Sequence, residues 1–82
     1  MTLELFQQVA LTRDWPEHRL RAGDVATLVD FVPHPAGGEG GCVLEVFNAV
    51  GESIAVLTAP VSAVEILRAN EILTVRSWAT AA

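Results

Sequence analysis

The most restrictive feature of the chain is a glycine–aspartate turn that leads directly into a long β-prone run. Gly23 precedes Asp24, and residues 24–32 read Asp-Val-Ala-Thr-Leu-Val-Asp-Phe-Val. Glycine adopts a positive φ without a Cβ clash, so we expect Gly23 to take the left-handed conformation. The first half of the run is apolar on both faces, which is typical of a central or strongly bent strand. We therefore expect both halves of the fold to pack on this strand.

Further β-prone segments flank this strand and are separated by turn signals. They are residues 8–13, 42–47, 52–58, 64–67 and 72–76. A hairpin turn is expected at residues 48–51, with Gly51 in the left-handed position, and one 3₁₀ turn is expected next to Pro60. No segment shows helical periodicity beyond about two turns. The pattern predicts an all-β fold, a small SH3-like barrel of five to six short, strongly bent antiparallel strands.

The length of 82 residues predicts a single domain over residues 1–82. Residues 77–82 are expected to be a fraying tail unless Trp78 anchors it. A domain of this size buries only about 60% of its unfolded surface, so its core is thin. Cys42 is the only cysteine and cannot form an internal disulfide, and together with His18 and His34 it lacks the spacing of a zinc site. We expect neither a metal nor a cofactor.

The charge balance disfavours two classes of partner. The chain contains ten acidic residues, five arginines and no lysine, so its net charge is −5. Nucleic acids and anionic membranes both select for basic surfaces. No apolar run is long enough to span a membrane, and the N-terminus lacks the basic region of a signal peptide. A lone cysteine fits a reducing compartment, so we expect a cytoplasmic protein.

The chain resembles a family of small bacterial proteins, the domain-of-unknown-function family 4926. The matching segments are residues 9–14, 16–18, 22–29, 44–48 with Gly51, and 55–58. The resemblance covers residues 6–76 and implies an SH3-like barrel without an established activity. It also implies a partner-binding or antitoxin-like role, because members often form half of a two-gene neighbourhood. The family pattern usually has Gly at the position of Ala26 and Leu at that of Trp15.

The first loop contains acidic residues and a histidine that could act in catalysis. Asp14, Glu17 and Asp24 bracket the first loop, and two close carboxylates can perform acid–base chemistry. Three arginines lie among them, which favours loop-ordering ion pairs. His18 has no Ser or Cys near it in the sequence to serve as a nucleophile. We therefore expect that the protein is not an enzyme.

Two further features are a lone cysteine and a glycine-rich segment. Cys42 begins a strand without a basic neighbour that would lower its pKa. The glycine-rich segment 37–41 precedes a strand and contains no lysine, whereas a phosphate-binding loop precedes a helix. Neither feature predicts a site, and no small-molecule substrate is evident.

Recognition of a protein partner is the function that the sequence favours. Its candidate residues are Trp15, Pro16, Glu17 and His18, because SH3-like barrels dock peptides on loop aromatics. Burial of Trp15 in the barrel and a contact role for Trp78 remain open at this point. We expect a non-enzymatic protein-interaction domain, the small antitoxin-like half of a two-gene pair, and a homodimer through an edge strand at residues 72–76. The alternative is a KOW-type nucleic-acid-binding module, for which the chain lacks a basic stripe.

Overall fold

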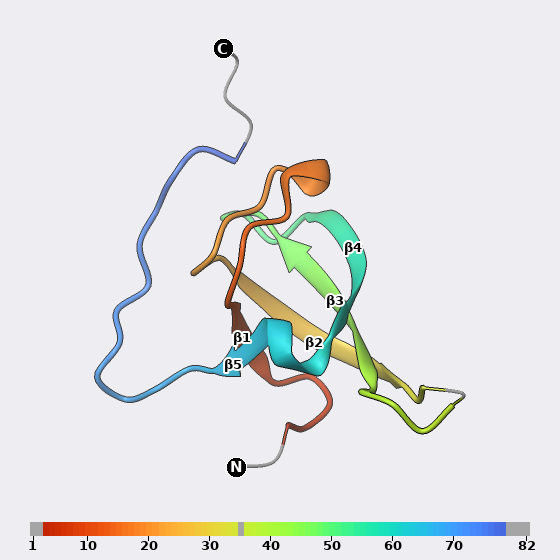
Figure 1. The fold of residues 1–82 in the computed structure, drawn as a ribbon. Coiled ribbons are helices and arrows are strands. Elements are labelled where there is room, and N and C mark those ends of the chain that lie inside the picture. The colour runs from red at the N-terminus through yellow and green to blue at the C-terminus, as the bar shows by residue number, and fades with distance from the viewer. Residues whose placement is uncertain (1–2, 35, 79–82) are drawn as a thin grey trace.

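A computed structural model describes residues 3–34 and 36–78. Its elements are β1 (Gln8–Leu11), η1 (Pro16–His18), β2 (Val25–Val32), β3 (Gly41–Phe47), β4 (Ser53–Pro60), η2 (Val61–Ala63) and β5 (Val64–Ile66), where η marks a 3₁₀ turn (Figure 1). The predicted all-β class is confirmed, with five strands. Over the described ranges no helix has the length and apolar character needed to cross a membrane.

The five strands form one antiparallel sheet in the order β4-β3-β2-β1-β5. The central position of β2, predicted from its apolar faces, is confirmed. Val9 of β1 lies opposite Ala26 of β2, and Leu44 of β3 lies opposite Leu57 of β4. The register of β2 against β3 shifts between Leu28 and Asp30, a bulge that bends the strand. Strands β4 and β5 are the outermost in the sheet, so each has one edge that no other described strand pairs with.

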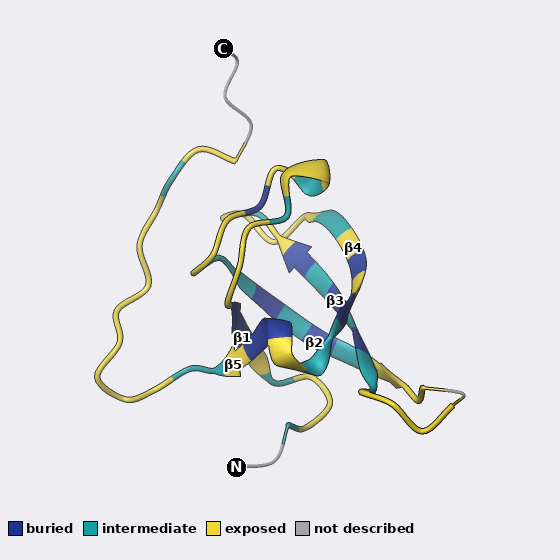
Figure 2. Cartoon of the chain, viewed as in Figure 1, coloured by how far each residue is buried: buried dark blue, intermediate teal, exposed yellow. Residues whose placement is uncertain are grey.

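One apolar cluster on the inner side of the bent sheet forms the core (Figure 2). Leu28 and Leu44, both fully buried, lie on the two neighbouring central strands and face each other in the register. Val9 and Leu11 extend the cluster along β1, and Leu20 joins it from the first loop (residues 12–24). No buried polar or charged residue occurs among the described residues. The fold therefore depends on apolar packing and on its hydrogen-bonded ladders.

The two predicted left-handed glycines are confirmed. Gly23 has a φ of 93° and Gly51 a φ of 86°. The Gly23 amide donates to the Leu11 carbonyl at 2.8 Å, so the turn is fastened to the end of β1. The predicted 3₁₀ turn follows Pro60 as η2, and Pro60 is tolerated in β4 because this strand lies at the sheet edge.

The predicted strand at residues 72–76 is wrong. Residues 67–78, which we call the strap, leave β5 as an open arc that bows away from the sheet and returns to the first loop at its end (Figure 1). β-prone side chains form a strand only where a neighbouring strand pairs with them. Ile72 and Val75 instead remain 88% and 92% exposed.

Two residues of the expected tail, Ser77 and Trp78, lie within the described part of the chain. Ser77 and Trp78 both take part in hydrogen bonds at the end of the strap. The remaining residues of that predicted tail, 79–82, lie outside the described part of the chain.

Candidate functional site

The first loop is an ordered scaffold in which Trp15 and Leu20 form an isolated antiparallel bridge. Their backbone amides donate to each other's carbonyl groups at 2.9 and 3.0 Å. The bridge closes a short hairpin around η1, which ends at Arg19 in the left-handed conformation, with a φ of 57°. Leu20 is buried in the core and fixes the loop to the domain. The loop therefore presents its backbone carbonyls in fixed positions.

Of the four predicted partner-binding residues, Trp15 lies closest to the core. It is half-buried and packs against the core cluster, and the guanidinium carbon of Arg13 lies 4.4 Å from its ring centroid. Its indole nitrogen is buried without a hydrogen-bond partner among the described residues. Pro16 and Glu17 are exposed, and His18 is half-buried. The outer surface of the loop thus consists of η1, and the ring of Trp15 lies on its inner side, against the core cluster.

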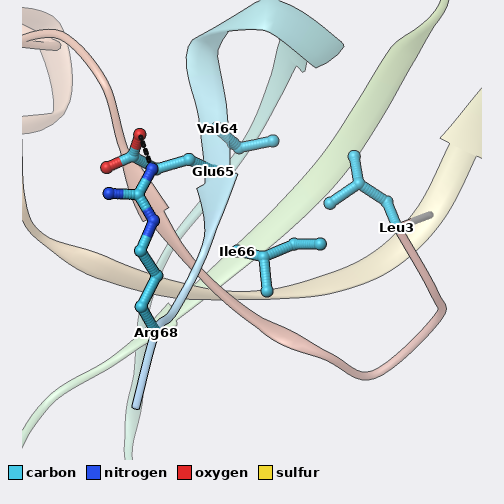
Figure 3. Close-up of a pocket in the computed structure, with 5 residues that line it drawn as sticks. All are labelled: Leu3, Val64, Glu65, Ile66 and Arg68. Atoms are coloured by element: carbon cyan, nitrogen blue, oxygen red, sulfur yellow. Dashed lines mark ion pairs between the residues drawn. The ribbon is translucent and has the colours of Figure 1, made fainter. Parts of the chain in front are cut away.

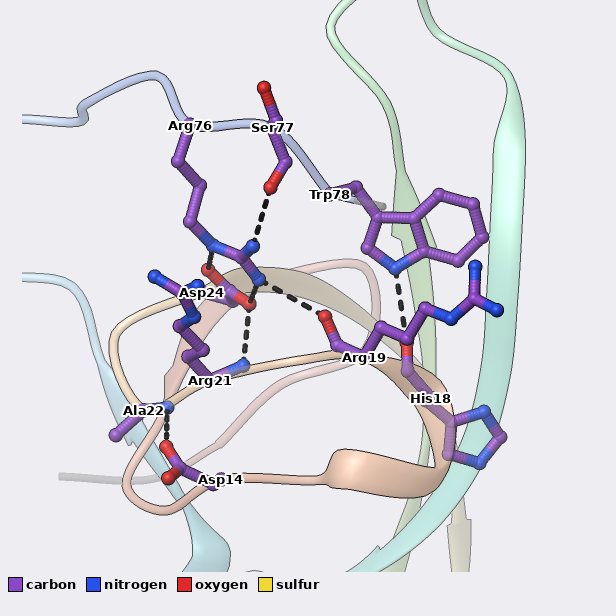
Figure 4. Close-up of polar contacts among 9 residues, drawn as sticks. All are labelled: Asp14, His18, Arg19, Arg21, Ala22, Asp24, Arg76, Ser77 and Trp78. Carbon is purple, nitrogen blue, oxygen red and sulfur yellow. Dashed lines mark hydrogen bonds and ion pairs between the residues drawn. The ribbon is translucent and has the colours of Figure 1, made fainter. Parts of the chain in front are cut away.

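An open hollow of about 260 Å³ lies between η1 and the beginning of β4. We call this hollow, together with the neighbouring Asp24 carboxylate, the seat. The residues of the domain that line the hollow are Glu17, His18, Arg19, Ile54 and Ala55, and Trp78 of the strap lines it from the other side. Figure 4 shows the indole of Trp78 beside the Arg19 side chain and the His18 backbone. Two of the four predicted residues, Glu17 and His18, therefore line the seat.

Arg76 holds the strap to the domain through several polar contacts (Figure 4). Its Nε donates to Oδ1 of Asp24 at 2.9 Å, and Nη2 forms an ion pair with Oδ2 of the same carboxylate. Nη2 also donates to the Arg19 carbonyl at 3.2 Å. Two parallel contacts between a guanidinium and a carboxylate fix orientation as well as distance. The Arg76–Asp24 pair is therefore the main polar anchor of the strap.

The electrostatics of this pair follow from its geometry. Partial burial acts to raise the pKa of Asp24, but hydrogen bonds from the Arg76 side chain and the Arg21 amide, with both arginine charges, hold it below its usual value. The hydrogen bond to Asp24 raises the pKa of Arg76. The Asp24 side chain is 19% exposed and the Arg76 side chain is 27% exposed. Both groups are therefore charged at neutral pH, and partial burial reduces the solvent screening of their attraction.

Trp78 provides the second anchor. Its Nε1 donates to the His18 carbonyl at 3.0 Å, and the side chain remains 36% exposed. The sequence pointed to Trp78 as a possible anchor of the chain's last residues and as a candidate contact residue. It offered no signal for the pairing of Arg76 with Asp24, which are distant in sequence. The arrangement as a whole accepts a guanidinium at a carboxylate and an indole N–H at a backbone carbonyl.

The other sequence candidates have structural roles. Asp14 Oδ1 accepts a hydrogen bond from the Ala22 amide at 2.9 Å, as expected of a carboxylate that orders the loop. Nδ1 of His34 accepts from the amides of Ala36 and Gly38 and so organises the glycine-rich loop. Cys42 is buried, and burial raises the pKa of its thiol. Within the described ranges, no group of three or more His, Cys, Asp or Glu side chains is placed to hold a metal ion.

A second hollow, of about 320 Å³, lies at the free edge of β5, where the strap begins (Figure 3). Leu3, Val64 and Ile66 provide its apolar lining. At its border, Arg68 forms an ion pair with Glu65 at 3.8 Å, and both side chains are well exposed. An exposed pair of this kind contributes little to stability. This hollow therefore has no polar anchor comparable to the one in the seat.

Comparison with known proteins identifies a family but no individual relative. Neither the curated proteins nor the solved structures include a match to this chain. The family model described as a domain of unknown function, DUF4926, matches residues 5–66, from the segment before β1 through β5. Because this match covers well over half of the sequence, the chain belongs to the DUF4926 family.

Proposed function

We propose that the protein is a non-enzymatic protein-interaction domain whose docking site is the seat between the first loop and β4. The observation that carries the proposal is the pair of contacts made by Arg76 and Trp78, a salt bridge to Asp24 and a hydrogen bond to the His18 carbonyl. An extended segment with an arginine and a tryptophan two positions apart thus makes both contacts with the seat. The ligand class is an extended peptide segment that carries this spacing.

The composition of the seat supports a peptide ligand. A backbone carbonyl and a carboxylate accept hydrogen bonds in fixed positions, and Ile54 and Ala55 provide apolar contact area next to them. Fixed polar groups beside an apolar surface are typical of sites that recognise extended peptides. Arginine and tryptophan are also the residue types most often found at the energetic centre of protein interfaces. The net charge of −5 favours a partner segment with a positive charge.

The strap occupies the seat within the chain, so any partner has to displace it. Displacement is feasible because only the end of the strap is anchored, through Arg76 and Trp78, whereas residues 72–75 form no hydrogen bond within the described part of the chain. The antitoxin-like role expected from the family resemblance fits this arrangement, since a neighbouring gene product is then the natural source of the displacing segment. We retain that role as part of the proposal.

A titration with a peptide tests the proposed function. The probe is a fluorescent peptide with the sequence of residues 70–78, and the receptor is the full chain with Arg76→Ala and Trp78→Ala, in which the seat is vacated. Saturable binding is expected. The matched control peptide has alanine at both positions and should not bind. Equal signals from the two peptides, or no binding of the first peptide to a receptor that is folded by circular dichroism, would contradict the proposal.

A further inference from the structure

We infer that the strap is exchanged between two copies of this chain, so that Arg76 and Trp78 of each copy occupy the seat of the other. This inference rests on the proposed function of the seat and names a second copy of the chain as its occupant. The first observation is the division of the strap into two parts. Its end makes specific contacts with Asp24 and His18, whereas its arc, residues 67–75, forms only local hydrogen bonds within the described chain.

The arc carries apolar side chains that are largely exposed among the described residues. Ile72, Leu73 and Val75 are 88%, 61% and 92% exposed. They belong to a β-prone run that forms no strand in the single chain. Clustered apolar exposure of this kind marks a contact surface. The arc therefore has the composition of a strand without a partner strand.

Exchange supplies that partner strand. When two straps cross around a two-fold axis, their arcs run antiparallel. In the register centred on Thr74, Leu73 of one copy lies opposite Val75 of the other on one face of the two-stranded ribbon. Cross-strand apolar pairs stabilise such ribbons. Leu73 and Val75, which are exposed in the single chain, thus contact each other across the dimer, while both seats keep their polar contacts.

The dimensions of the chain permit the exchange. An extended segment covers about 3.3 Å per residue, so residues 67–75 reach up to roughly 30 Å. The hinge is the exit of the strap from β5 at Ile66, where the family match also ends. Exchange of an identical element preserves every contact of its anchored end and is a low-cost route to a symmetric dimer.

Charge-reversed variants of the full chain test the inference. Asp24→Arg alone places two positive charges at the seat, and Arg76→Asp alone places two negative charges there. This holds whether a strap occupies the seat of its own copy or that of an identical copy. In a mixture of the two, strap exchange restores an opposite-charge pair at both seats. We expect the mixture to form a heterodimer of twice 8.8 kDa with one copy of each variant, as measured by native mass spectrometry and sedimentation, while each variant alone stays monomeric. The double variant, Asp24→Arg with Arg76→Asp, restores the pair in every copy and should self-associate like the natural chain.

A second variant keeps the test decisive if a single reversal prevents folding. Leu73→Asp with Val75→Asp leaves the seat intact and should abolish the dimer while Trp78 stays seated. A natural chain that remains monomeric at millimolar concentration, or a mixture that shows no heterodimer, overturns the exchange. If the peptide of residues 70–78 still binds the vacated seat in that case, the proposed function stands. Failure of that peptide to bind removes the proposed function itself.

Discussion

Arg76 and Asp24 stand 52 positions apart in the sequence and form a two-contact ion pair in the folded chain. Asp24 follows the left-handed Gly23 immediately, and the Arg21 amide also donates to its carboxylate, at 2.7 Å. The turn that organises the first loop therefore also positions the acceptor for the strap. The Gly23–Asp24 turn, which the sequence predicts to have a structural role, thus also takes part in the candidate site.

A double-mutant cycle should measure the contribution of this pair. Asp24→Asn and Arg76→Ala are each expected to lower the free energy of unfolding by about 1 kcal/mol, because the pair is only partly exposed and is held by two contacts. The loss in the double variant should be smaller than the sum of the single losses. Arg68→Ala is the matched control, since its exposed partner Glu65 lies 3.8 Å away. Equal losses for Arg68 and Arg76 would contradict the account.

Acid should weaken the attachment of the strap. The pKa of Asp24 is lower in the folded chain than in the unfolded chain, so its ionisation stabilises the fold at neutral pH. This contribution is fully present above the unfolded value of about 3.9 and is lost as the pH falls through the lower folded value. In urea titrations, the stability difference between the natural chain and Asp24→Asn should be constant at pH 5–8 and should shrink below about pH 4. A difference that grows on acidification would reverse the assigned sign.

The turn at Gly23 should be sensitive to a β-branched residue. Gly23 has a φ of 93°, and a Cβ added at this position would meet no atom within 4 Å, so the cost is confined to the backbone. Gly23→Val is expected to lower the free energy of unfolding by about 1–3 kcal/mol. Gly40→Ala is the control, because its backbone has no positive φ and its Cβ contact of 3.6 Å is ordinary. An unchanged melting midpoint for Gly23→Val would show that the turn tolerates side chains.

The sequence predicted the features that depend on local chemistry. Gly23 and Gly51 were identified because turns need a positive φ, and Pro60 marked the beginning of a 3₁₀ turn. The strand predicted at residues 72–76 failed because β propensity does not specify a neighbouring strand. Glu17 and His18, which the sequence predicted as partner-binding residues, line the hollow, whereas the contact between Arg76 and Asp24 depends on the path of the strap and leaves no local pattern.

The thiol of Cys42 should be unreactive in the folded chain. The side chain is fully buried, and burial raises its pKa, so little thiolate is present and reagents cannot reach it. Labelling with a thiol reagent at pH 8 should be slow without denaturant and fast in guanidinium chloride. Labelling at equal rates in both conditions would show that β3 opens freely and would place Cys42 among the accessible groups.

The indole N–H signals of the two tryptophans test the seated strap most directly, in a proton–nitrogen NMR spectrum of the full chain. Trp78 donates to the His18 carbonyl at 3.0 Å, so its indole signal should be displaced from the free-tryptophan position and should show cross-peaks to His18 and Arg19. Arg76→Ala should move this signal to the free position and leave the buried Trp15 signal unchanged. A Trp78 signal that has the free position in the natural chain and lacks those cross-peaks would contradict the account.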